Sequence, residues 1–349
     1  MPPATQPLIN MTLKRKPRLL LLSTLLLATA AAGAPGNDRK NPPVAVETTS
    51  NGKRPVLWRD PVDIGSRNLF YGPGGPADQP HGGFTFRKED LHGTNPKYDV
   101  RDADDVKWTV KLGAEARPET VATRLVWAAG YFANEDYFLA SAHIDEMPSR
   151  LHRGQKLVHD GTVLNVRLKR EHLKKIGTWS WRDDPFAGTR EWNGLRVVMA
   201  LVNNWDLKDD NNAIYQDKDG ERLYLVSDVG ASFGESRADW PLTKSKGNLR
   251  SYSRSRFITK VTPTEVSFAD PARPGFVWLV RPADYFHRLE LRWIGRDVPR
   301  ADAKWMGNLL GQLSPAQIED AFRAAGYSPE EIEAFARVVE NRIAALKAL

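Results

Sequence analysis

The stretch ALVNNWDLKDDNNAIY, residues 200–215, joins two apolar segments through about ten mostly polar residues. The first apolar run ends at Val202, and apolar residues resume at Ala213 and Ile214. A cluster of polar residues between two apolar runs is typical of a solvated loop. Carboxylates and amides are also groups that bind metal ions and orient phosphates. Other parts of the sequence are therefore needed to distinguish a solvated loop from a site that binds a metal ion or phosphate.

The spacing inside this stretch suits the transfer of a phosphoryl group. Residues 206–211 follow the pattern D-x-K-x-x-N, with Asp206, Lys208 and Asn211 at its fixed positions. Phosphoryl transfer needs a carboxylate that orients the attacking hydroxyl and accepts its proton, a cation near the migrating group, and an amide oxygen that holds a metal ion. The three residues supply one of each. Such a pattern also arises by chance in polar loops, so it needs support from elsewhere in the chain.

A second acidic residue follows at a suitable distance. Asp228 begins the triplet Asp228-Val229-Gly230, directly after the strand-like run LYLVS at 223–227. A carboxylate is a group that binds metal ions, and the glycine lets the backbone turn sharply after it.

A lysine and two glutamates precede these motifs. Lys111 lies at the end of the strand-like run VKWTVKL, residues 106–112. Helical spacing of apolar residues, with a proline suited to the first turn, predicts a helix over 118–132. Glu119 lies in its first turn, and Glu115 lies just before it. A strand lysine that pairs with a helix glutamate holds nucleotide phosphates in phosphoryl-transfer enzymes.

Each of these residues also has a structural explanation. A lone strand lysine is by default exposed, and the helix dipole alone favours an acid such as Glu119 in a first turn. The sequence does not decide between Glu115 and Glu119 as the partner of Lys111. Gly93 lies between the first two predicted strands, where a phosphate-covering loop belongs, but it stands there alone instead of in a glycine-rich run.

Taken in chain order, the motifs resemble those of protein kinases. A loop glycine, a strand lysine, a helix glutamate, the D-x-K-x-x-N stretch and an Asp-x-Gly triplet follow one another as they do in that superfamily. The chain is identified as a divergent member of the protein-kinase-like superfamily, similar to secretory-pathway and spore-coat kinases. The resemblance extends from about Phe84 to at least Gly234.

The resemblance implies an α+β fold of two lobes, a strand-rich N-terminal lobe and a mainly helical C-terminal lobe. It implies ATP and magnesium or manganese as cofactors, and a hydroxyl-bearing substrate that is a protein, a glycan or a small molecule. Carried over by position, it implies Lys111 on the nucleotide phosphates, Glu119 or Glu115 as its partner, Gly93 over the phosphates, Asp206 as base with Lys208 beside it, and Asn211 and Asp228 as metal ligands.

The chain also departs from the family pattern. Asn204-Trp205 stands where protein kinases have His-Arg, Val229 replaces Phe, and no Ala-Pro-Glu closes the activation segment. Without that arginine, the resemblance does not imply a receiver for an activation-loop phosphate. Two alternatives remain open: a kinase-fold binding protein without turnover, and a kinase-fold nucleotidyltransferase. A binding protein without turnover usually loses at least one of the lysine, the two aspartates and the asparagine, and all four are retained here.

Periodicity predicts the remaining organisation. Residues 84–160 are expected to form the N-terminal lobe and 161–349 the C-terminal lobe. The basic run LKREHLKK, residues 168–175, is interpreted as the solvated face of a helix. Further strands are expected near 84–90, 97–103, 137–144 and 157–168, a buried helix within 184–204, a hairpin over 212–228, and two helices that begin with Ser-Pro after residue 313.

The N-terminal region predicts export. Four basic residues precede the apolar run LLLLSTLLLATAAAGA at 19–34, which is the layout of a signal peptide over residues 1–34. An uncleaved anchor is the alternative. Residues 35–83 are interpreted as a linker or irregular segment. We therefore expect a periplasmic or secreted protein that has no membrane partner after cleavage.

Composition excludes several other functions. The net charge is +7, but without the four N-terminal charges it falls to +3, which argues against a nucleic-acid partner. The absence of cysteine excludes disulfides, thiol catalysis and cysteine-bound zinc. The seven histidines show no metal-ligand spacing. The segment KSKGNLRSYSRSR, residues 244–256, is the best candidate for contact with a polyanionic partner.

Overall fold

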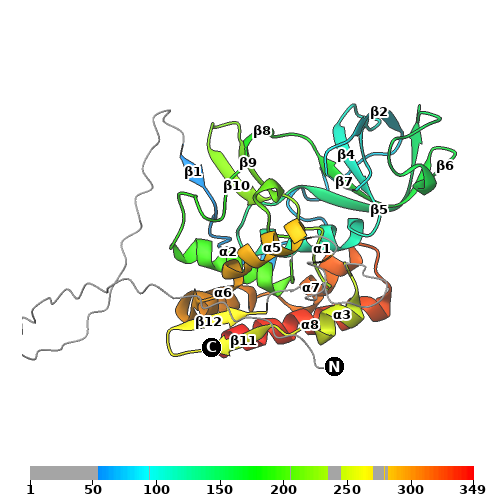
Figure 1. Cartoon of the computed structure of the whole chain (residues 1–349). Coiled ribbons are helices and arrows are strands. Elements are labelled where there is room, and N and C mark those ends of the chain that lie inside the picture. Colours follow the sequence, from blue (N-terminus) through cyan, green and yellow to red (C-terminus); the bar gives the residue numbers. More distant parts are fainter. Residues whose placement is uncertain (1–53, 94, 205, 235–244, 270–278, 280–281) are drawn as a thin grey trace, which may run out of the picture. The chain divides into compact units, whose positions relative to one another are not determined.

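The computed structural model describes residues 54–93, 95–204, 206–234, 245–269, 279 and 282–349, all of which belong to one compact unit, residues 44–349. The predicted signal peptide and the first part of the predicted linker lie outside the described residues. The described chain is α+β: its N-terminal region is rich in strands and its C-terminal region is mainly helical (Figure 1). The predicted fold class is thereby confirmed.

A six-stranded sheet forms the strand-rich region. Antiparallel pairs link β2 to β3, β3 to β4, β4 to β7 and β7 to β5, and a short parallel pairing of β2 with β5 joins the two ends. The strands are β2 (Phe84–Asp90), β3 (Lys97–Arg101), β4 (Lys107–Leu112), β5 (Asp136–Asp145), β6 (Val158–His159) and β7 (Thr162–Arg170).

Alternating apolar side chains explain why these segments form strands. Tyr98, Val100, Trp108, Val110 and other inward-facing residues make a core of their own inside the sheet. The sheet continues beyond residue 160, where the sequence placed the boundary between the lobes, because β7 pairs with both β4 and β5.

One local interpretation was wrong. The basic run 168–175 is not a helix, because its first residues complete β7 and its last two begin β8 (Lys174–Gly177). A run of basic residues is compatible both with a solvated helix face and with the exposed end of a strand, so the charges alone do not distinguish the two. The pairing of β7 with β4 and β5 decides in favour of a strand.

A second sheet contains the predicted hairpin. Its strands lie in the order β1 (Pro55–Val56), β10 (Arg222–Val226), β9 (Asn212–Gln216) and β8. β9 and β10 are antiparallel, as the turn at Asp219-Gly220 predicts, and Gly220 has a positive φ of 83°.

The described part of the predicted linker is packed against the protein. Residues 54–83 contain only β1 and the short 3-10 helix η1 (Ile64–Ser66), so they are largely irregular. Leu57, Ile64 and Leu69 nevertheless lie in the main hydrophobic core. From β1 onward, the segment is therefore part of the folded unit.

The helices pack around a larger core. The described helices are α1 (Ala116–Ala128), α2 (Arg190–Leu201), α3 (Leu249–Arg254), α5 (Pro282–Glu290), α6 (Arg300–Leu310), α7 (Pro315–Arg323) and α8 (Pro329–Lys347). α7 and α8 begin with capping boxes at Ser314 and Ser328, as the two Ser-Pro motifs predict. Thr189 caps α2 by accepting a hydrogen bond from the amide of Trp192.

Helix α1 connects the two regions. It contacts β5 and β7 of the six-stranded sheet and also α2 and α7 (Figure 1). A three-stranded sheet of β11 (Ile258–Val261), β12 (Glu265–Phe268) and β13 (Val298–Pro299) lies in the C-terminal region. Among the described residues, no helix combines the length and the apolar character needed to cross a bilayer.

Candidate active site

Three separate segments bring the predicted site residues together. Lys111 lies on β4, and its side chain is only 2% exposed. Gly113, with a φ of 92°, allows the chain to leave β4 and enter α1 within a few residues. Glu115 is the N-cap of α1, and Glu119 lies in its first turn. Asp228 follows β10 directly.

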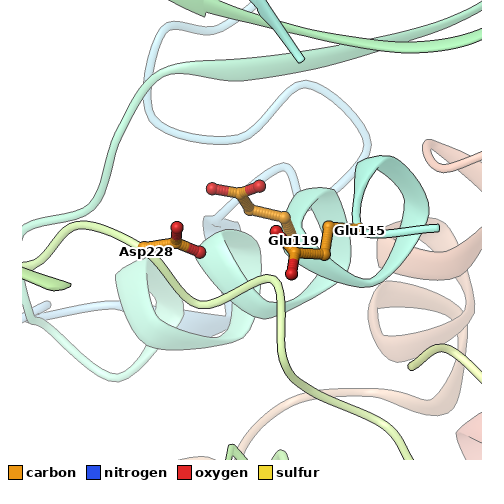
Figure 2. Close-up of side chains that lie close together, drawn as sticks. All are labelled: Glu115, Glu119 and Asp228. Carbon is orange, nitrogen blue, oxygen red and sulfur yellow. The ribbon is translucent and has the colours of Figure 1, made fainter. Parts of the chain in front are cut away.

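The ammonium group of Lys111 contacts all three carboxylates. Its Nζ atom lies 2.7 Å from Oε2 of Glu115, 2.8 Å from Oε2 of Glu119 and 3.1 Å from Oδ1 of Asp228. Figure 2 shows the two glutamates on α1 and the aspartate on the neighbouring segment. The sequence left open whether Glu115 or Glu119 is the partner of Lys111, and in the structure both glutamates pair with it.

The Lys111 ammonium lies among the three carboxylates of this cluster. The carboxylates of Glu115, Glu119 and Asp228 lie within 4.8 Å of one another, a spacing that also suits a cation. The Lys111 ammonium already lies between them, and a metal ion placed there would meet its positive charge. The side chain of Asp228 is 43% exposed, whereas those of the two glutamates are buried. Asp228 alone among the three can therefore reach a ligand from the solvent.

Charge and burial shift the pKa values in the cluster. Burial disfavours the charged form of Lys111, but the carboxylates of Glu119, Asp228 and Glu115 outweigh burial and raise its pKa. Burial acts to raise the pKa of Glu115, but Lys111 and Lys246 lower it to about 2. For Glu119, which is completely buried, desolvation raises the pKa although Arg167 and Lys111 oppose the shift.

Two further buried charged residues, Arg167 and Asp136, lie beside Glu119, and the sequence analysis did not identify them. Arg167 on β7 donates a hydrogen bond from Nη2 to Oε1 of Glu119 at 2.8 Å, and its Nη1 lies 3.5 Å from Oδ1 of Asp136. Asp136 has no exposed surface, and neither of its carboxylate oxygens accepts a hydrogen bond in the described part of the chain. No motif identifies either residue, since each is a single charge within an ordinary strand pattern.

Glu115 has further partners. The ammonium of Lys246 and the side-chain amide of Asn95 both contact its carboxylate. Lys246 comes from the basic segment 244–256, whose first residue lies outside the described part of the chain. Glu115 thus joins the start of α1 to the chain that follows Asp228.

The stretch 206–211 lies next to Asp228. The carbonyl oxygen of Asn211 accepts hydrogen bonds from the amides of Ser227 at 2.8 Å and Asp228 at 3.0 Å. The side-chain amide of Asn211 donates to the carbonyl oxygen of Asp206 at 2.5 Å. Because this bond uses the Nδ2 atom, it orients the side chain without using its oxygen. Lys208 forms an ion pair with Asp206 at 3.4 Å.

Two glycines differ from the expectations. Gly93 lies in the connection between β2 and β3 with a φ of 71°, as expected for a turn, but no contact in the described residues joins it to Lys111. Gly230 does not adopt a positive φ, so it does not serve the sharp turn that the sequence predicts. A Cβ atom on Gly230 would lie 2.9 Å from Cβ of Glu115. A glycine is needed there because the two segments approach closely.

Comparisons with known proteins find similarity only among solved structures. No protein-family model matches the chain, and no curated protein matches its sequence. The structure is similar to that of the proinflammatory kinase CtkA of Helicobacter pylori, with 10% identity and a TM-score of 0.38 over 76% of this chain and 93% of that chain.

The structure is also similar to two structures of the Golgi casein kinase. The one with Mn and ADP bound has 10% identity and a TM-score of 0.37 over 77% of this chain and 72% of that chain. The other has 10% identity and a TM-score of 0.34 over 77% and 73%. Likeness at this level assigns no role to any residue. In protein kinases a strand lysine joins a helix glutamate beside the metal-binding aspartate. Lys111, Glu119 and Asp228 have this arrangement in the structure.

Proposed function

We propose that the chain is an exported kinase of atypical type, which binds ATP with Mg²⁺ or Mn²⁺ and transfers the γ-phosphoryl group to a hydroxyl group. The observation that supports this most is the joint contact of Lys111 with Glu119 and Asp228. A buried ammonium is stable only with close anionic partners. Here Glu119 comes from α1 and Asp228 comes from the segment after β10. In a kinase the corresponding helix and segment lie together at the nucleotide.

Lys111 would bind the nucleotide phosphates. Its ammonium stays charged because its pKa is raised, and Glu119 and Glu115 hold it at the end of β4. The carboxylate of Asp228 and the side-chain oxygen of Asn211 are hard oxygen donors, which Mg²⁺ and Mn²⁺ prefer. These two residues fit the metal and would hold it. A bound metal ion would supply positive charge against the phosphate oxygens.

Asp206 would orient the substrate hydroxyl and accept its proton. The loop that carries it is held by the bond between the Asn211 side chain and the Asp206 carbonyl. Lys208, 3.4 Å from the Asp206 carboxylate, brings a positive charge to the same place. In phosphoryl transfer such a cation stabilises the charge that develops on the migrating group.

Thermal stability of the full chain tests nucleotide binding. We expect ATP with Mg²⁺ or Mn²⁺ to raise the melting temperature, because a ligand that binds only the folded state stabilises it. The rise should disappear in Asp228→Ala. It should persist in Asp219→Ala, a matched control, because Asp219 is an exposed acid in the β9–β10 turn. No rise with either metal in the unaltered chain would contradict the proposal.

The products separate the proposed reaction from nucleotidyl transfer. Phosphoryl transfer to an acceptor, or slowly to water, releases ADP, whereas nucleotidyl transfer releases pyrophosphate. We expect ADP, and we expect Asp206→Asn to retain nucleotide binding but to lose most of the turnover. Release of pyrophosphate, or nucleotide binding without any product, would exclude the kinase proposal.

Export can be tested in cells. The full chain should be processed near residues 30–34 and recovered outside the cytoplasm, because residues 1–34 have the layout of a signal peptide. A chain that lacks residues 1–34 should remain inside. Recovery of the unprocessed full chain in the membrane fraction would indicate an uncleaved anchor instead.

A further inference from the structure

A cavity of about 540 Å³ lies beside the start of α1, apart from the residues assigned to the nucleotide. Its wall comes from residues 113–118, from the region of β6 and β7, from residues 246–247, and from the start of α8. Neither Lys111 nor Asp228 lines it. The cavity is large enough for a small organic ligand.

Positive charge predominates in the wall. Arg117, Lys156 and Lys246 line the cavity, and Glu331 is the single acidic residue among its described lining residues. Glu331 belongs to the capping box of α8, where its Oε2 atom accepts a hydrogen bond from the amide of Ser328 at 3.1 Å. The carboxylate is thus engaged at the helix terminus, and the wall keeps a net positive charge.

Arg117 is held in place without a counter-charge. Its guanidinium lies 5.4 Å from the ring centroid of Tyr327 and 5.7 Å from that of Phe138, and its Nη2 donates to Oδ1 of Asn165 at 3.2 Å. Within the described residues, neither Arg117 nor Lys156 forms an ion pair with a carboxylate. Among the residues that the structure describes, two cations at one cavity therefore lack an anionic partner.

Unsatisfied polar atoms lie in the same wall. Tyr327 is only 7% exposed, and its hydroxyl has no hydrogen-bond partner in the part of the chain that the structure describes. The same is true of the Nε atom of Arg117. Buried polar atoms without partners are uncommon in folded proteins, and a bound ligand is one way to satisfy them.

The rim of the cavity is apolar. Leu157 and Leu164 line it and are 41% and 60% exposed, so the cavity presents two large apolar side chains to the solvent. A free phosphate ion would leave both leucines in contact with water. A phosphate attached to an apolar group would cover them.

We propose that this cavity binds an organic phosphate monoester. Its phosphate group lies among Arg117, Lys156 and Lys246, and its apolar part covers Leu157 and Leu164. Arginine and lysine side chains bind phosphate through charge-assisted hydrogen bonds. Lys246 also contacts Glu115, so the cavity adjoins the Lys111 cluster but uses different cations. This proposal does not depend on the proposed phosphoryl transfer.

Phenyl phosphate is a suitable probe for the full chain, with inorganic phosphate as its comparison. We expect phenyl phosphate to bind, measured by calorimetry and by the rise in melting temperature, and to bind more tightly than inorganic phosphate. The double variant Arg117→Gln/Lys156→Gln should lose at least tenfold in affinity. The matched control Lys260→Gln should bind as the unaltered chain does, because Lys260 is an exposed strand lysine on β11.

Asp228→Ala separates this cavity from the nucleotide site. Binding of phenyl phosphate should persist in Asp228→Ala, and the melting temperature of each variant without ligand shows whether it is folded. Binding that disappears in Asp228→Ala, or that is unchanged in the folded double variant, overturns the proposal. Equal affinity for inorganic phosphate overturns the assignment of a monoester with an apolar part. No binding of either probe overturns the site altogether.

Discussion

The Lys111 ammonium lies 3.1 Å from Oδ1 of Asp228, although 117 positions separate the two residues in the chain. The contact joins β4 of the six-stranded sheet to the segment that follows β10 of the second sheet. Because Glu115 and Glu119 share the same ammonium, the position of α1 is also tied to this contact. Changes to any of these charges are expected to affect both stability and ligand binding.

Lys111→Met should destabilise the protein strongly. The substitution leaves the carboxylates of Glu115, Glu119 and Asp228 close together without their shared cation. Removing one partner from a buried ion pair typically costs about 3–5 kcal/mol in the free energy of unfolding. Urea denaturation measures this loss. The exposed control Lys260→Met should change stability by no more than about 0.5 kcal/mol, and a similarly small effect of Lys111→Met would show that the cluster does not hold the two regions together.

Arg167 and Asp136 should behave as a coupled pair. Arg167→Met removes the guanidinium that contacts two buried carboxylates, on Glu119 and Asp136, and should cost about 3–5 kcal/mol. Asp136→Asn removes one of these charges, so the double variant should lose less stability than the sum of the single variants. A double-mutant cycle with urea denaturation measures the coupling free energy, which we expect to lie in the range of about 0.5–3 kcal/mol. Strict additivity would show that the two side chains do not contribute to stability as a coupled pair.

Glu115 should make stability depend on pH in the acidic range. Burial acts to raise its pKa, but Lys111 and Lys246 lower it from the usual 4.5 to about 2. A lowered folded-state pKa contributes stability that is present above pH 4.5 and is lost as the pH falls towards 2. The full contribution corresponds to roughly 3 kcal/mol. The free energy of unfolding, compared between the unaltered chain and Glu115→Gln, should therefore converge on acidification, and a constant difference from pH 6 to pH 2 would contradict this account.

Gly230→Ala should destabilise the protein. The added Cβ would lie 2.9 Å from Cβ of Glu115, which cannot move without shifting the start of α1. Such overpacking typically costs about 1–3 kcal/mol. Gly82→Ala is the control, because a Cβ there meets nothing within 4 Å and its φ is not positive. Equal melting temperatures for the two variants would show that the close approach of the two segments is not important.

Local elements were largely predictable from the sequence. The strand β2 has the predicted bounds, Phe84–Asp90, because its limits are marked by turn residues on both sides. The starts of α7 and α8 follow from Ser314 and Ser328, whose side chains cap their own helices. The run 168–175 was misread as a helix because its charges carry no information about the strands that pair with it.

By itself, the sequence determined the bounds of β2, the hairpin turn at Asp219-Gly220 and the starts of α7 and α8, because hydrophobic period, turns and caps are local properties. Motif spacing also led to Lys111, Asp206, Asn211 and Asp228 as the predicted site residues. Only the tertiary structure decided that both glutamates pair with Lys111, that Arg167 and Asp136 lie behind Glu119, and that Gly230 serves close packing instead of a turn. These contacts join segments that are far apart in the chain. Their geometry depends on how the sheets and helices pack, and no local pattern encodes it.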